Sequence, residues 1–141
     1  MRIRPADVTD AVAVFTLLDQ SAGGQPRRAA FDHNYEQLIA AMTYDDTDFL
    51  VADHDGDVVG YVLAARVLSL HAGGPVSHLL ELVVAQAHRG QGIGGMLVDA
   101  VVRRARRAGA VEVHVIARRI PGYFERLGFA ETATCLTLPL S

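Results

Sequence analysis

The chain has 141 residues, of which half are apolar and 21% are charged, and its formal net charge is −3. This length and composition predict one globular domain spanning residues 1–141, and they exclude a disordered, collagen-like or disulfide-stapled chain. The single cysteine, Cys135, has no partner for an internal bridge. All thirteen basic residues are arginines, which excludes a Walker-type phosphate loop and Schiff-base chemistry because both need a lysine.

The two halves of the chain carry opposite charge. Residues 1–57 hold eleven acidic side chains and four arginines, a net charge of −7, whereas residues 58–141 hold five and nine, a net charge of +4. An anionic ligand would favour the second half, although a solvated surface is the simpler explanation. No apolar run at the start resembles a secretory signal, and none approaches the roughly 20 residues that span a bilayer. We therefore expect a cytoplasmic protein without a membrane partner.

The spacing of apolar residues predicts both helices and strands, because amphipathic helices repeat every three to four residues and half-buried strands every two. In the first half the pattern predicts a strand beginning at Ile3, helices over Asp7–Gln20 and around Tyr35–Met42, and a hairpin of strands Phe49–Ala52 and Val58–Val67. In the second half it predicts a buried strand Leu79–Val84, a long helix from Ile93 that ends at Gly109, and a strand Val111–Ala117. A short helix Gly122–Leu127 and a last strand Phe129–Leu138 follow. This order is typical of a layered α/β domain with a mixed sheet flanked by about four helices.

A glycine-rich loop, Arg89–Gly95, separates the predicted buried strand from the long helix. Glycines let backbone amides approach a ligand closely, and the following helix adds the positive end of its dipole, so the loop suits a pyrophosphate. Arg89 adds a charge-assisted donor. Gly90, Gly92 and Gly95 also match the dinucleotide-binding fingerprint, but that fingerprint normally opens a βαβ domain, whereas here it follows a hairpin and two helices. The other alternative is a turn that serves only strand-to-helix packing.

Three segments share a family pattern: Glu81–Val84, the R-x-x-G-x-G run Arg89–Gly94, and Tyr123–Phe129 with its Gly-Phe ending. Together they resemble the GNAT superfamily of acyl-CoA-dependent N-acetyltransferases, and the order of elements matches over nearly the whole chain. The resemblance implies a single GNAT-like domain of the α+β layered type. Its central sheet would be mixed and mostly antiparallel, with the strands Leu79–Val84 and Val111–Ala117 splayed apart.

The resemblance also implies acetyl-CoA as co-substrate. In the family the glycine loop wraps the pyrophosphate of this molecule, and the backbone of the preceding strand pairs with its pantetheine arm. The residues at these positions are Leu82, Val83, Val84, Arg89, Gly90, Gln91, Gly92, Ile93, Gly94 and Gly95. Dimerisation is common in the family, so the resemblance also allows a homodimer.

Glu81 is the candidate general base. It is the only acidic residue in the apolar strand beside the glycine loop, and partial burial there would raise its pKa toward that of a useful base, acting directly or through water. The alternative is a carboxylate that only orients the substrate. The resemblance implies that a strand amide near Val83 holds the developing oxyanion.

Tyr123 is the candidate general acid. The resemblance implies a tyrosine five residues before the phenylalanine of the Gly-Phe pair, but Phe124 occupies that position and Tyr123 precedes it. One residue turns a helical side chain by about 100°, so Tyr123 reaches the thiolate only if the helix starts differently after Gly122. Alternatively no acid is needed, because a thiol with a pKa near 8.5 leaves tolerably well as its thiolate.

Other polar residues give weaker signals. His71, Ser77 and His78 could line an acceptor pocket, although surface histidines are common, and no histidine set has metal-ligand spacing, so no metal is expected. The arginines at 103, 104, 106 and 107 are expected on a solvated helix face. The net charge of −3, without interleaved aromatic residues, argues against a nucleic-acid partner. Cys135 is expected in the core.

The resemblance places the acceptor site in the acidic first half. Several acidic residues there either attract a cationic amine or are merely solvated: Asp32, Glu36, Asp45, Asp46 and Asp48. Short runs at Phe31–His33, Leu70–His71 and Glu81–Val84 are similar to the aminoalkylphosphonate N-acetyltransferase branch, so aminoalkylphosphonates stand beside aminoglycosides, polyamines, amino acids and peptide amino termini as candidate acceptors.

We therefore expect direct transfer of an acetyl group from acetyl-CoA to a primary amine of a small molecule. One alternative is a non-catalytic acyl-CoA-binding sensor or regulatory module, because the usual tyrosine position holds Phe124. The other is a nucleotide- or dinucleotide-binding enzyme.

Overall fold

The computed structural model describes residues 1–21, 26–44, 46–117 and 122–140. Its centre is a five-stranded sheet in the order β1-β2-β3-β4-β5, formed by β1 (Arg2–Pro5), β2 (Thr47–His54), β3 (Asp57–Ser69), β4 (Gly74–Val84) and β5 (Glu112–Val115). Neighbouring strands are antiparallel except β4 and β5, which are parallel. The expected mixed and mostly antiparallel sheet is therefore confirmed.

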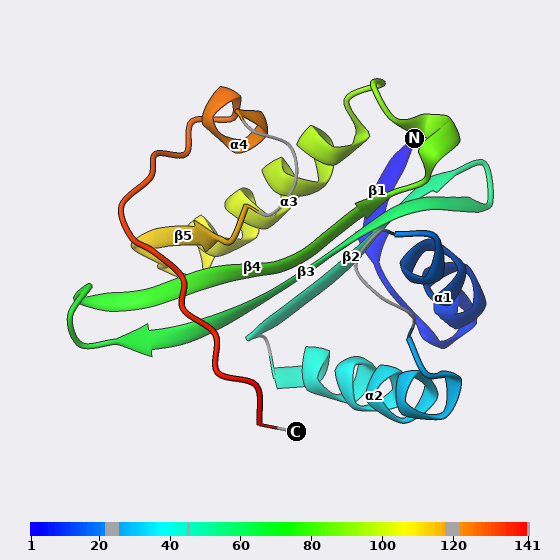
Figure 1. Cartoon of the computed structure of the whole chain (residues 1–141), viewed down its shortest axis with the longest axis horizontal. Helices are drawn as coiled ribbons and strands as arrows, with labels where there is room; N and C mark the ends of the chain where they lie inside the picture. The colour runs from blue at the N-terminus through cyan, green and yellow to red at the C-terminus, as the bar shows by residue number, and fades with distance from the viewer. Residues whose placement is uncertain (22–25, 45, 118–121, 141) are drawn as a thin grey trace.

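Helices cover both faces of this sheet (Figure 1). They are α1 (Ala11–Gln20), α2 (Arg28–Ala41), α3 (Ile93–Arg107) and the short α4 (Tyr123–Arg126), with 3-10 turns at Val8–Asp10, Met42–Tyr44 and Gln86–His88. Helices α1 and α2 lie on one face, whereas α3 lies on the other with α4 beside it. Within the described ranges, no helix is long and apolar enough to cross a membrane.

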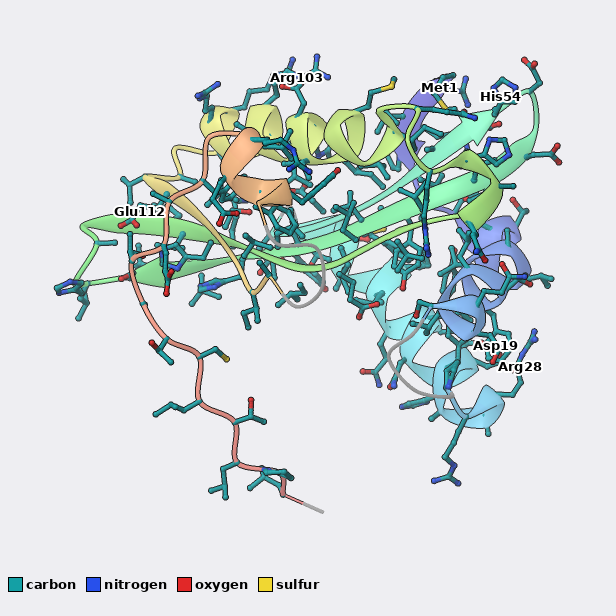
Figure 2. All side chains as sticks on the ribbon, turned by 45° about the horizontal axis from the view of Figure 1, so that its top comes forward. Met1, Asp19, Arg28, His54, Arg103 and Glu112 are labelled. Carbon is teal, nitrogen blue, oxygen red and sulfur yellow. The ribbon has the colours of Figure 1, made fainter. Side chains whose placement is uncertain are left out.

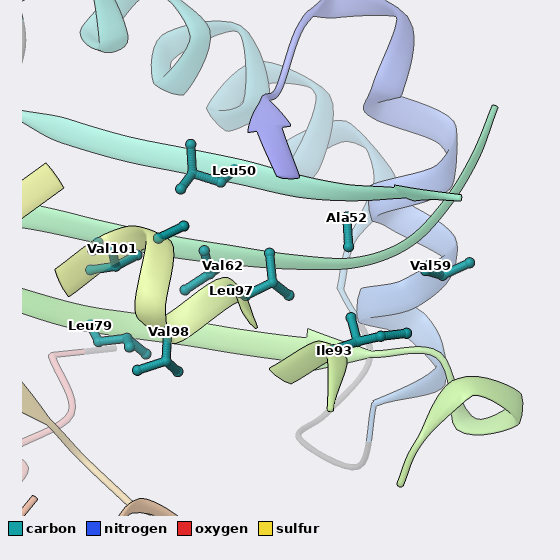
Figure 3. Packing of buried hydrophobic residues seen from close by; sticks show 11 residues of the cluster. Leu50, Ala52, Val59, Val62, Leu79, Ile93, Leu97, Val98 and Val101 are labelled. Atoms are coloured by element: carbon teal, nitrogen blue, oxygen red, sulfur yellow. The ribbon is translucent and has the colours of Figure 1, made fainter. Parts of the chain in front are cut away.

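The alternation of side chains along the strands builds one apolar core on each face of the sheet. Leu50 and Val62 face α3, where they pack against Leu97 and Val101 in the cluster shown in Figure 3. The adjacent residues of the same strands point the other way, toward α1 and α2. That second cluster contains Ala6, Val14, Leu17, Tyr35, Phe49, Val51, Tyr61 and Leu63.

Gly60 of β3 lets α3 lie close to the sheet. A Cβ at this position would lie 3.1 Å from the carbonyl oxygen of Val83 and 3.3 Å from Cδ1 of Leu97. Both distances are shorter than ordinary van der Waals contact, so a larger residue would force the Val83 carbonyl and the Leu97 side chain to shift. The glycine therefore sets the position of α3, whose first turn belongs to the glycine-rich loop.

A β-bulge in β4 changes which face its side chains occupy. Leu63 of β3 pairs with Glu81, while the next residue, Ala64, pairs with Leu79, so Leu80 is the extra residue. Leu79 and Leu82 both pack in the α3 core although they are three residues apart. Because side chains alternate with a period of two, only the inserted residue allows this. The bulge therefore turns Glu81 toward α1 and α2.

Strands β4 and β5 pair over only part of their length. The register runs from Val76, opposite Glu112, to Leu79, opposite Val115. Beyond Leu79, β4 continues to Val84 without β5 beside it. Among the described strands, none pairs with the outer edge of this half of β4 on the side of β5, as expected for a splayed pair.

A buried ion network joins β2, β3 and α3. Asp48 is 1% exposed and accepts hydrogen bonds from Arg66 of β3 and, at 2.9 Å, from Nε of Arg104 of α3. Arg104 therefore does not belong to a purely solvated face, and Asp48 is not free to attract an amine, so both expectations were wrong. Asp32 is paired with Arg28 at 3.1 Å, and Asp45 lies outside the described residues.

The predicted last strand, Phe129–Leu138, is wrong for the described structure. Residues 129–140 adopt no regular secondary structure, and the side chains of Leu136, Leu138 and Leu140 are 90%, 82% and 94% exposed. Figure 2 shows this C-terminal segment running away from the sheet with its side chains in the open. Cys135 is also exposed, so its expected place in the core was wrong. A strand forms only beside a partner strand, and within the described chain this segment has none.

Candidate functional site

The glycine-rich loop forms an anion-binding corner at the start of α3. Gly90 and Gly92 have φ angles of 79° and 81°, a left-handed conformation that strains other residues. Gly92 is the N-cap of the 15-residue α3, and no side chain caps that helix. Its first-turn amides are therefore free of a side-chain acceptor, at the positive end of the helix dipole. The exposed Arg89 lies beside them, with Nε 3.3 Å from the Val84 carbonyl oxygen.

Tyr123 reaches this corner because α4 starts abruptly. Gly122, with φ 81°, is its N-cap, and Tyr123 is its first residue. A Cβ on Gly94 would lie only 2.2 Å from the Tyr123 hydroxyl oxygen, so this hydroxyl lies against the first turn of α3. Phe124 instead packs against Phe129, with ring centroids 5.6 Å apart. The unusual order of these two residues therefore still brings a tyrosine hydroxyl to the glycine loop.

The Tyr123 phenol is protonated at neutral pH. Partial burial raises its pKa above the ordinary value, and the nearby Arg126 guanidinium opposes this shift in part. A protonated phenol is a hydrogen-bond donor. At the glycine loop it can donate to an atom that gains negative charge.

Glu81 lies on the other face of β4. Its Oε1 accepts a hydrogen bond of 2.8 Å from the hydroxyl of Tyr61, which is 2% exposed. Burial and the negative charge of Glu81 raise the pKa of Tyr61, so this phenol stays protonated and orients the carboxylate. Glu81 itself is exposed, so its expected partial burial was wrong.

The outer edge of β4 lies between the glycine-rich loop with Tyr123 and the Glu81 carboxylate. The amide of Ala85 donates to the carbonyl oxygen of Val59 at 2.8 Å, and Val83 pairs with Tyr61 in the same register. Backbone groups alternate along an antiparallel strand, so those of Val83 face β3 while those of Leu82 and Val84 face outward. The outward groups lie where β5 no longer accompanies β4. An extended ligand can pair with β4 there.

A cleft of about 260 Å³ lies between α1, α2 and the sheet, and Glu81 and Tyr61 line one part of it. Most of its other described lining residues are apolar: Val14, Leu18, Phe31, Leu38, Phe49 and Leu63. The cleft thus joins a carboxylate to an apolar chamber on the face of the sheet opposite α3.

The weaker candidates from the sequence lie elsewhere. His71 is exposed, and Ser77 is fully buried with no hydrogen-bond partner for its hydroxyl in the described chain. His78 packs against the ring of His114, with centroids 5.3 Å apart. Neither His71, Ser77 nor His78 lines the cleft beside Glu81. Among the described residues, no three histidine, cysteine or acidic side chains gather as a metal ion would need.

Comparisons with known proteins identify the family of this chain. The model of the acetyltransferase (GNAT) family matches residues 12–129. The chain is 30% identical over 138 residues to glucosamine 6-phosphate N-acetyltransferase 1 of Oryza sativa subsp. japonica, which covers 92% of this chain and 81% of the rice protein. A transcriptional regulator from Bacillus halodurans C-125 has the same fold, with a TM-score of 0.87, 20% identity and 99% coverage of both chains.

A second solved structure is AAC(6')-Iy in complex with the bisubstrate analogue CoA-S-monomethyl-acetylneamine. It has a TM-score of 0.80 and 22% identity, and it covers 99% of this chain and 97% of its own. The chain described here belongs to the acetyltransferase (GNAT) family. It is an acetyl-CoA-dependent N-acetyltransferase, with acetyl-CoA as its co-substrate. The antiparallel order of β1 to β4 also differs from the parallel sheet of a dinucleotide-binding domain.

Sequence reasoning missed Tyr61 and the apolar cleft. Tyr61 lies in the predicted strand Val58–Val67, and its period-two spacing from Val59 and Leu63 gives no sign of a polar partner. Its partner Glu81 is 20 residues away, on the neighbouring strand. Only the register, with its bulge at Leu80, shows that the two side chains share a face.

Proposed function

We propose that this chain transfers the acetyl group of acetyl-CoA to a primary amine of a small molecule by direct attack, with Glu81 as general base and Tyr123 as general acid. One observation carries the proposal. The open outer edge of β4 lies between a carboxylate oriented by Tyr61 on one face and a tyrosine hydroxyl at the glycine loop on the other. The acceptor would enter from the α1–α2 side and the donor from the α3 side.

Residues of this chain fit the parts of acetyl-CoA. The pyrophosphate would lie on Arg89–Gly95, where the uncapped first turn of α3 and the left-handed Gly90 and Gly92 present amides. The pantetheine arm would pair with the strand Leu82–Val84, through the outward groups of Leu82 and Val84. The amide that holds the developing oxyanion would be one of these outward amides, because that of Val83 faces β3.

The chemistry then needs two proton transfers. Acetyl-CoA supplies the acetyl group as a thioester. The new bond joins the amine nitrogen to the acetyl carbon, and the carbon–sulfur bond breaks. Glu81, directly or through water, takes the proton that the amine loses, and the Tyr123 hydroxyl gives a proton to the departing sulfur. Two similar proteins support a small-molecule amine as acceptor. The rice relative is named for glucosamine 6-phosphate, and AAC(6')-Iy was solved with the bisubstrate analogue CoA-S-monomethyl-acetylneamine.

The test replaces the base and keeps the donor site. Glu81→Gln should lower kcat by at least about a hundredfold, because a positioned base contributes about 10²- to 10⁴-fold. Its affinity for acetyl-CoA, measured by calorimetry, should not change. Glu112→Gln is the matched control, since Glu112 is exposed on β5 and its carboxylate pairs with His114 of its own strand. An unchanged kcat in Glu81→Gln would remove Glu81 from the chemistry. Binding of acetyl-CoA without thiol release for any amine would favour a sensor.

We also propose a homodimer held by the C-terminal segment. Residues 129–140 expose alternate leucines, and β5 is a four-residue edge strand whose outer side is unpaired in the described sheet. Exposed edges and apolar extended segments pair with other chains. Light scattering should give a dimer mass, and Leu136→Glu with Leu138→Glu should give a monomer. A monomeric parent protein would contradict the proposal.

A further inference from the structure

The geometry points to a particular acceptor class: a monoamine whose amino group is carried on an aryl or alkyl body. This inference rests on the proposed function, because it assigns the acceptor end of the same site. It comes from the chemistry of the cleft between α1, α2 and the sheet, and it differs from the amino sugar named for the rice relative.

The walls of the cleft are apolar where the body of the acceptor would lie. The aromatic residues Phe31 and Phe49 line it together with Leu18, Leu38 and Leu63. Phe31 and Phe49 each also lie within 5.5 Å, centroid to centroid, of the Tyr35 ring. The aromatic wall is therefore held by packing rather than left mobile. Such a wall favours apolar groups and offers no hydrogen bonds to hydroxyl groups.

A few polar side chains also line the cleft. Glu81 is the only acidic side chain among the described lining residues, and Tyr61 holds it. The hydroxyl of Tyr35 donates to the backbone oxygen of Asp7 at 2.7 Å, so its proton is already used and it does not donate to a ligand. Arg27 and Asn34 are exposed lining residues. One carboxylate suits one ammonium group, and the Arg27 cation disfavours a second, so polyamines and aminoglycosides fit poorly.

The size of the cleft agrees with this class. An apolar cavity of about 150 Å³ holds a benzene molecule, and the cleft here measures about 260 Å³. It therefore has room for one aromatic ring with a short chain that ends in an amine. Each methylene buried there should strengthen binding by about three- to fourfold. Each hydroxyl buried without a partner should weaken binding by about tenfold.

The experiment compares three amines: 2-phenylethylamine, glucosamine and spermidine. Thiol release gives kcat/KM for each, and ligand-observed NMR measures the binding of each amine independently of turnover. We expect kcat/KM for 2-phenylethylamine to exceed that for the other two by at least about a hundredfold. An n-alkylamine series should bind about three- to fourfold tighter for each added methylene until the cleft is full.

A pair of α2 variants tests whether the amine binds in this cleft. Ala30→Leu places bulk at an exposed lining position, whereas Ala29→Leu places the same bulk at the exposed neighbour that does not line the cleft. Ala30→Leu should weaken binding of 2-phenylethylamine by at least about fivefold, and Ala29→Leu should stay within about twofold of the parent protein. Both variants keep a good helix former in α2.

The outcomes separate the acceptor class from the proposed function. Preferred acetylation of glucosamine or spermidine would overturn the apolar class and leave acetyl transfer intact. Binding of 2-phenylethylamine that Ala30→Leu weakens, without acetylation of any amine, would support the apolar cleft and overturn the proposed transfer. Absence of both binding and acetylation of 2-phenylethylamine, or equal effects of the two leucine variants, would overturn the inference.

Discussion

A methyl group added at Gly94 tests whether Tyr123 acts in the reaction. The Cβ of Gly94→Ala would lie 2.2 Å from the Tyr123 hydroxyl oxygen and 3.3 Å from its Cζ. A separation of 2.2 Å is far inside van der Waals contact, so the hydroxyl must move away from the first turn of α3. If the hydroxyl protonates the departing sulfur, Gly94→Ala and Tyr123→Phe should each lower kcat by at least about tenfold.

The double variant makes this test specific. Both substitutions remove the same donor, so Gly94→Ala in the Tyr123→Phe background should add little, and the total loss should stay near that of one substitution. Independent effects would instead multiply to about a hundredfold. Thiol release at saturating acetyl-CoA gives kcat, and the KM for acetyl-CoA reports separately on the loop.

Gly95→Ala is the matched control for the added methyl group. The nearest atom to a Cβ at Gly95 is Cδ2 of Leu127 at 3.8 Å, which is ordinary contact. Both glycines lie in the first turn of α3, so the two alanine variants gain similar helix propensity. At saturating acetyl-CoA, Gly95→Ala should therefore lower kcat much less than Gly94→Ala, although both glycines belong to the proposed pyrophosphate loop. The reasoning is refuted if Gly94→Ala retains full kcat, or if the double variant loses the product of the two single losses.

Three further predictions concern stability and pH. Asp48→Ala should lower the free energy of unfolding by about 3–5 kcal/mol, because it removes the buried carboxylate that accepts hydrogen bonds from Arg66 and Arg104. Urea titration of Asp46→Ala, at an exposed neighbour, should show less than about 0.5 kcal/mol. Leu79→Ala should cost about 2–5 kcal/mol, since Leu79 is 4% exposed, while Leu80→Ala, at a 57% exposed bulge residue, should change the urea midpoint very little; equal losses would contradict the bulge. The hydrogen bonds that Asp53 accepts from Arg4 and from the Gly56 amide lower the pKa of its carboxyl group. The contribution of Asp53 to stability is therefore complete above its unfolded pKa of about 3.9, and it is lost as the pH falls below that value through the lower folded pKa. Asp53→Asn should therefore show a smaller fall in thermal midpoint below pH 4 than the parent protein, and equal falls would contradict this.

Much of the fold follows from local patterns in the sequence. The period-two runs of β2 and β3 and the amphipathic repeat of α3 are properties of neighbouring residues, and Gly109, with φ 81°, closes α3 as expected. The prediction of a last strand was wrong because a strand forms only where another strand pairs with it. The alternation of Leu136, Leu138 and Leu140 is a strand pattern, but in the described chain no neighbour pairs with it.

The glycine loop was predictable for the same local reason, whereas the direction of the Tyr123 side chain was left open by the sequence. Gly90 and Gly92 have positive φ angles, so the backbone itself needs glycine at these two positions. Helical phase predicts the direction of a side chain only where the helix already extends before that residue. Because α4 starts at Tyr123 and is only four residues long, the direction of the side chain is set by Gly122 rather than by a helical phase.

The position of Glu81 depends on a single inserted residue that the sequence does not reveal. Without the bulge, Glu81 would share a face with Leu79 and would point into the apolar core beneath α3, where a carboxylate has no partner. With Leu80 inserted, Glu81 faces Tyr61 and the cleft, while Leu82 and Val84 return to the α3 core. The bulge thus lets one strand place a carboxylate toward the proposed acceptor and keep its apolar packing beside the proposed donor site. The same backbone edge can therefore serve both substrates from opposite faces of the sheet.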